Sequence, residues 1–118
     1  MNFRATRLRS RYDDRKLLVD SIVTQLGRYR KNAKTVDAEE IEQYIAKNVE
    51  AFMKWKLKDK ADGIQEKYAE QCKSLSKFVE NISKTVLREK KASMYLVWHM
   101  VRHLFWRCDD LVERVNCR

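Results

Sequence analysis

The sequence predicts an all-α protein, a compact antiparallel bundle of about four helices. The 118 residues contain no proline and only two glycines, so few positions favour tight turns or end helices. Four segments of roughly 20 residues space their apolar side chains three and four apart, which places those side chains on one helix face. Short connectors between the segments favour antiparallel neighbours. A domain of this length buries a core without disulfides or a structural metal.

The first segment begins with several arginines and continues with an apolar seam, which is the row of apolar side chains along one face of a helix. Residues 1–9 are predicted to form a basic N-terminal arm, and residues 10–118 a single helical-bundle domain. The helix is expected to begin near Ser10, because Ser10 and Asp13 resemble a capping box. Arg15 interrupts the seam and is expected to snorkel to solvent at the end of the bundle; pairing with a buried carboxylate is the other interpretation. The seam consists of Leu8, Tyr12, Val19, Ile22, Leu26 and Tyr29.

Two further helices are expected in the middle of the chain. The second begins after Asp37, with Glu40 placed to complete a cap and to interact with the helix dipole. Its seam is Ile41, Tyr44, Ile45, Phe52 and Met53. Asp62 and Gly63 form the clearest turn signal and separate the second helix from the third. The third helix has the most regular seam, formed by Ile64, Tyr68, Cys72, Leu75, Val79, Ile82 and Val86.

The fourth helix is expected to run from an N-cap at Ser93 to about Val115. No proline or glycine enforces a break before Ser93, so the alternative is that helices three and four form one longer rod. The helix has an ordinary apolar face and, opposite it, a second group of aromatic residues. A four-helix monomer does not usually bury both faces of one helix, and Tyr, Trp and Arg are the residues that anchor interfaces. We therefore predict a partner-binding face at Tyr95, His99, Arg102 and Trp106, with burial inside the bundle as the structural alternative.

The formal net charge of +9 favours an anionic partner, and three groups of residues are candidates for binding it. The arm carries Arg4, Arg7, Arg9 and Arg11, and the side of the third helix opposite its seam carries Lys73, Lys77, Lys84, Arg88 and Lys91. A third cluster is Lys54, Trp55 and Lys56. Cations spaced along a helix neutralise successive phosphates, and an aromatic ring between cations stacks on an unpaired base. The structural alternatives are a solubilising arm, a solvated helix face and a ring packed in its own bundle.

Other functional classes find little support. His99 and His103 stand four residues apart, but no Glu lies between them and Arg102 disfavours a cation, so no metal or cofactor is expected. Glycine-rich phosphate loops and Ser-His-Asp arrangements are absent from the sequence, and we expect no enzyme. The three cysteines form no close pair and no signal peptide is visible, which favours a reducing, cytoplasmic compartment. No apolar run is long enough to span a membrane.

The resulting hypothesis is a non-enzymatic basic bundle that binds the nucleic-acid backbone, DNA or RNA, as an accessory subunit of a larger nucleic-acid machine. The alternative is a protein-binding inhibitor or adaptor, of the kind found in phages and mobile elements, that docks on an acidic or nucleic-acid-binding surface of its partner. A second alternative is a self-assembling structural bundle, a homo-oligomer joined through the second face of the fourth helix.

Overall fold

The computed structural model describes the backbone of residues 3–88 and 93–117, and the side chains of residues 15–87 and 93–117. These residues form five α-helices and one short 3-10 helix, and no strand occurs among them. The elements are α1 (Phe3–Lys31), α2 (Ala38–Leu57), η1 (Lys58–Ala61), α3 (Ile64–Lys67), α4 (Ala69–Arg88) and α5 (Met94–Asn116). The predicted all-α bundle is confirmed.

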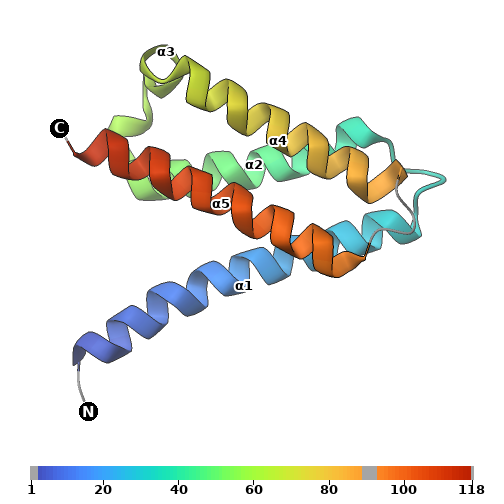
Figure 1. Cartoon of the computed structure of the whole chain (residues 1–118), viewed down its shortest axis with the longest axis horizontal. Helices are drawn as coiled ribbons and strands as arrows, with labels where there is room; N and C mark the ends of the chain where they lie inside the picture. Colours follow the sequence, from blue (N-terminus) through green and yellow to red (C-terminus); the bar gives the residue numbers. More distant parts are fainter. Residues whose placement is uncertain (1–2, 89–92, 118) are drawn as a thin grey trace.

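Helix α5 packs against α1, α2 and α4 (Figure 1), and those three helices also contact one another. Helices α4 and α5 lie side by side and run in opposite directions. Arg107 of α5 donates a hydrogen bond from Nη1 to Oγ of Ser74 on α4, at 3.1 Å, which ties the two helices together. The alternative of one long rod is therefore wrong. Ser93 caps α5 as predicted, since its Oγ accepts a hydrogen bond from the backbone N–H of Tyr95 at 3.0 Å.

Helix α1 begins at Phe3, so the helix start expected near Ser10 is wrong. The residues before Ser10 include no glycine or proline, and alanine, leucine and arginine there favour continuation of the helix. Figure 1 shows the first half of α1 extending away from the other helices. The buried side chains described on this helix, Val19, Ile22 and Leu26, come from its second half. The division into an arm at residues 1–9 and a bundle at residues 10–118 stays a prediction.

The middle of the chain follows its local signals, with one interruption. Asp37 caps α2, because its Oδ1 accepts a hydrogen bond from the backbone N–H of Glu40 at 2.8 Å. Gly63 adopts a φ of 78°, the left-handed conformation that favours glycine, and is the N-cap residue that precedes α3. The third predicted helix is divided at Tyr68, whose φ of −124° and ψ of 44° are not helical. The N–H of Tyr68 still bonds to Ile64, and that of Cys72 to Tyr68, so the seam keeps its register across the break.

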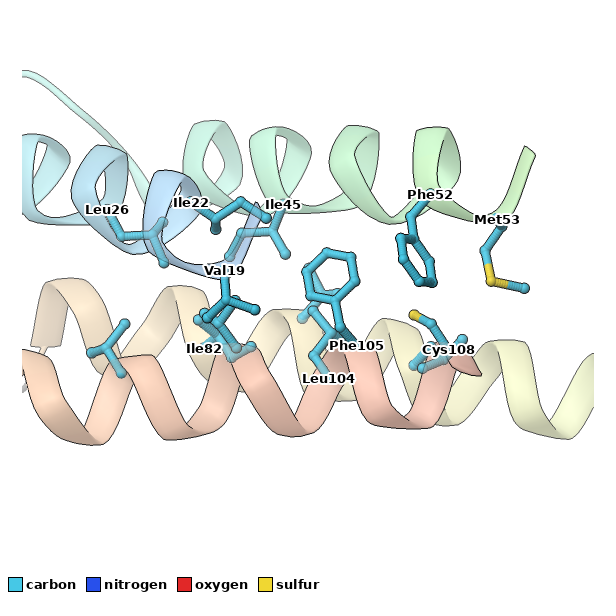
Figure 2. Packing of buried hydrophobic residues seen from close by; sticks show 14 of the residues in the cluster. Val19, Ile22, Leu26, Ile45, Phe52, Met53, Ile82, Leu104, Phe105 and Cys108 are labelled. Atoms are coloured by element: carbon cyan, nitrogen blue, oxygen red, sulfur yellow. The ribbon is translucent and has the colours of Figure 1, made fainter. Parts of the chain in front are cut away.

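The core is one cluster of buried apolar side chains contributed by α1, α2, α4 and α5. Figure 2 shows Phe52 of α2 and Phe105 of α5 facing each other within it, and their rings meet edge to face at 5.2 Å between centroids. Edge-to-face pairs of this kind stabilise cores beyond the area they bury. The cluster also includes Ile41, Ile45, Ile82, Val97, Val101, Leu104 and Cys108, each fully buried. This core fixes which side of α5 remains exposed.

Candidate functional site

The outer face of α5 is exposed, in contrast to its core face. Tyr95 exposes 70% of its surface and Trp106 exposes 45%, while His99 and Arg102 are half-buried. These four residues occupy one side of the helix because they recur at intervals of three and four. The structural alternative for this face, burial inside the bundle, is therefore wrong for Tyr95 and Trp106. That the face binds a partner remains a prediction.

Ring and cation contacts order the side chains along this face. The rings of Tyr95 and His99, one turn apart, meet edge to face with centroids 4.4 Å apart. The guanidinium carbon of Arg102 lies 4.4 Å from the ring centroid of Trp106, a cation–π contact. The same guanidinium lies 5.6 Å from the ring of Trp98. The face is therefore a continuous series of aromatic rings with a cation held between two of them.

A shallow hollow of about 320 Å³ lies where this face meets α4. The ring of His103 contacts that of Phe78 on α4, with centroids 5.4 Å apart. Arg107 of α5 also contacts Phe78, with its guanidinium carbon 4.8 Å from the centroid of the ring. No carboxylate is among the lining residues, which are Phe78, His99, Met100, Arg102, His103 and Trp106. The hollow is thus aromatic and cationic.

Sequence reasoning missed the contribution of α4 to this surface. Phe78 and Ser74 lie beside the apolar seam of α4, where the helical spacing indicates the edge of a buried face. The helix that covers that edge is α5, and the spacing of apolar residues along α4 does not indicate which helix packs there. Arg107 was missed for the same reason, since its hydrogen bond and its ring contact are both made to α4.

The opposite edge of the face is closed by α1. The indole N–H of Trp98 donates a hydrogen bond to Oδ1 of Asp20 on α1, at 2.8 Å. Trp98 is half-buried and packs against the core. It therefore anchors α1 to α5, and the exposed face runs between this contact and the hollow beside α4.

The basic stripe on α4 is only partly free of carboxylates. Lys73 and Lys77 are exposed, and neither forms an ion pair within residues 15–87 and 93–117. Lys84 is paired with Glu80 at 2.7 Å, and its hydrogen bond and charge lower the pKa of that carboxyl group. The side chain of Arg88 and the whole of Lys91 lie outside the described residues. The structure thus places two lysines of the predicted stripe at the solvent without an ion pair among the described residues, although the charge of Lys77 also lowers the pKa of Glu80.

The cluster at the end of α2 is exposed as well. Trp55 exposes 61% of its surface, and Nζ of Lys56 lies 4.7 Å from the centroid of its ring. Lys54 pairs instead with Glu50 at 3.0 Å. The ring of Trp55 also contacts that of Phe52 edge to face, with centroids 6.2 Å apart. The alternative that Trp55 is simply packed in its own bundle does not fit this exposure.

Two candidates remain, the arginines of the N-terminal arm and the pair His99 and His103, and the structure assembles neither into a site. The backbone of Arg4, Arg7, Arg9 and Arg11 lies in α1, and their side chains are outside the described part of the chain. His99 and His103 contact aromatic rings, and no group of three His, Cys, Asp or Glu residues able to hold a metal occurs in the part of the chain that the structure describes.

None of the helices in the described residues combines the length and the apolar character needed to cross a membrane. Comparison of the chain with protein-family models, with curated proteins and with solved structures found no match.

Proposed function

We propose that this protein is a non-enzymatic, nucleic-acid-binding accessory subunit that holds the sugar–phosphate backbone without sequence specificity. The observation that carries the proposal is the pair Lys73 and Lys77, exposed one turn apart on α4 and without an ion pair among the described residues. Residues four apart on a helix are separated by about 6 Å along its axis. Two cations at that spacing meet different phosphates of one strand, which carries a phosphate every ~3.4 Å of duplex axis.

The net charge of +9 supports the same proposal, because it draws a polyanion to the protein from a distance. Binding through phosphates releases condensed counterions, so the affinity falls steeply as salt rises. Three of the cations counted in that net charge, Arg4, Arg7 and Arg9, lie within the first nine residues.

The test is a salt titration of the affinity for a labelled oligonucleotide, made with wild type and with the double variant Lys73→Glu/Lys77→Glu. The matched control is Lys34→Glu/Lys47→Glu, which makes the same charge change at two exposed lysines elsewhere. The stripe variant should lower the slope of log affinity against log salt by about 1.4–1.8, for two lost phosphate contacts. Absence of binding at low salt, or an equal loss in the control, would overturn the proposal.

A protein-binding adaptor is the second candidate, and the exposed Tyr95 and Trp106 favour it, since such residues anchor protein interfaces. An adaptor forms a stable complex with another protein that survives nuclease treatment, and has no affinity of its own for nucleic acid. Affinity capture from the native host with and without nuclease separates the two candidates.

A further inference from the structure

We infer that the outer face of α5 is a stacking platform for unpaired bases, so that the protein prefers single-stranded DNA or RNA to duplex. This inference rests on the proposed function and names the form of nucleic acid that is bound. It is carried by the two exposed rings of Tyr95 and Trp106 and by the cationic character of their surroundings.

The two aromatic side chains are exposed to solvent at positions that the helix fixes. Tyr95 and Trp106 are eleven residues apart, so their backbones are separated by about 16 Å along α5. Between them, His99 contacts Tyr95 and Arg102 contacts Trp106, each through a ring or cation contact of 4.4 Å. These contacts restrict the side chains before any ligand arrives, which reduces the entropy lost on binding.

The charges around the rings favour a polyanion. Arg102 lies within the face, Arg107 lies over Phe78 beside the hollow, and the exposed Lys77 precedes Phe78 on α4. The lining of the hollow includes two histidines and an arginine but no carboxylate. A strand whose bases stack on Tyr95 and Trp106 therefore has cations within the face and along its α4 edge for its phosphates.

The same charges disfavour a second copy of this chain as the occupant. A twofold dimer brings the same patch of each subunit together, so Arg102 would face a cationic patch on its partner. Like charges brought together at an interface are unfavourable. A single strand meets no such repulsion.

Duplex does not fit the platform, because its bases are paired and stacked on one another and reach a protein ring only after they are unstacked. Single-stranded DNA and RNA present free base faces, and stacking on aromatic side chains tolerates any sequence. The platform adds base contacts to the phosphate contacts of Lys73 and Lys77 without adding sequence specificity.

The experiment measures fluorescence anisotropy with labelled oligo(dT), oligo(U), a DNA duplex of equal length and an abasic strand. The variants are Tyr95→Ala, Trp106→Ala and Trp106→Phe, which keeps a ring. Leu17→Ala is the control, because Leu17 is an apolar side chain of similar exposure, at 64%, on α1. Thermal melts confirm that the exposed substitutions leave the bundle folded.

Wild type should bind oligo(dT) or oligo(U) more tightly than either the duplex or the abasic strand. Trp106→Ala should weaken single-strand binding about 5- to 150-fold and leave duplex binding unchanged. Trp106→Phe should restore most of the loss, and Leu17→Ala should have no effect. A preference for oligo(U) over oligo(dT), or the reverse, identifies the strand chemistry and supports the inference in either direction.

Three outcomes overturn the inference, and they differ in what they leave standing. Equal affinity for single strands and duplex, unaltered by Trp106→Ala, removes the platform but leaves backbone binding intact. A nuclease-resistant protein complex that Trp106→Ala abolishes assigns the face to a protein. Failure of every probe to bind at low salt overturns the proposed function itself.

Discussion

The guanidinium of Arg15 lies 3.1 Å from Oδ2 of Asp109, and this ion pair joins α1 to α5. The side chains expose 38% and 25% of their surface, so the pair is partly shielded from water. Arg15 pairs with a carboxylate, as the second interpretation expected, but Asp109 is half-buried rather than buried, and the Arg15 side chain keeps partial access to solvent. Burial nevertheless raises the pKa of Asp109, because it outweighs the lowering effects of Arg15 and Lys56. The ion pair therefore does not fully offset the desolvation of the carboxylate.

The pKa of Asp109 leads to a prediction about pH. Since its folded pKa lies above the ordinary value, the folded state holds this proton more tightly than the unfolded state. The stabilising effect of Asp109 is present below the ordinary pKa and is lost as pH rises through the folded one. We expect Asp109→Asn to remove that loss and to leave the protein at least as stable at pH 7 as wild type. Urea unfolding between pH 3 and pH 8 measures the difference.

The neighbouring carboxylate contributes to this pH dependence. Asp110 is exposed, and its charge also raises the pKa of Asp109, so Asp110→Asn should reduce the pH dependence of unfolding by less than Asp109→Asn does. Arg15→Met should lower the free energy of unfolding at pH 7 by about 0.5–1 kcal/mol, because it removes a half-exposed ion pair. Asp109→Asn should not lower it. A large loss of stability in Asp109→Asn at pH 7 would show that the ion pair outweighs desolvation.

The hydrogen bond from Trp98 to Asp20 is the second contact between α1 and α5 that is open to test. Trp98→Phe keeps an aromatic ring in the core and removes the indole donor. We expect a loss of about 1–2 kcal/mol in the free energy of unfolding, since the acceptor is a carboxylate with some access to water. Asp20→Asn retains an acceptor and should cost less. A Trp98→Phe protein as stable as wild type would mean that water replaces the bond without cost.

Local signals predicted much of the fold, whereas contacts between helices were beyond sequence reasoning. Asp37 and Ser93 cap their helices through bonds to residues two or three positions away, so each cap can be read from a short stretch of the sequence. The bond between Trp98 and Asp20 joins residues 78 apart, and it depends on how α1 docks against α5. Nothing in the helical spacing of either segment specifies that docking.

The candidate site follows the same division. The exposure of Tyr95 and Trp106 follows from their place opposite the apolar seam of one helix, which the sequence contains in full. The roles of Phe78 and Arg107 depend on two helices meeting, and were not predicted. The exposure of Trp55 could not be predicted from the sequence, because this residue lies at the edge of the apolar seam of α2, where helical spacing is compatible with either burial or exposure.

Two consecutive residues of α5 should respond differently to the same substitution. Phe105 is fully buried against Phe52, whereas Trp106 is exposed. Phe105→Ala removes core contacts and leaves a cavity, and should lower the free energy of unfolding by about 3–5 kcal/mol. Trp106→Ala should change it by less than about 1 kcal/mol, because surface substitutions have small effects. Chemical denaturation of both variants makes the comparison, and similar losses would contradict the orientation of α5.

The three thiols should differ sharply in their reactivity toward iodoacetamide. Cys108 is fully buried, and burial, followed by the charges of Asp109 and Cys72, raises its pKa to about 12. At pH 8 about one molecule in ten thousand then carries the reactive thiolate at Cys108. Cys117 is exposed at the end of α5, and Cys72 is half-buried with a pKa raised by burial.

We therefore expect native protein at pH 8 to be alkylated first at Cys117, then at Cys72, and at Cys108 only through opening of the bundle. Peptide mapping by mass spectrometry over a time course gives the three rates. In denaturant the rates should converge, because the differences arise from folding. Phe105→Ala should accelerate labelling of Cys108 in particular, since a less stable bundle opens more often. Rapid labelling of Cys108 in the native wild type would contradict its place in the core.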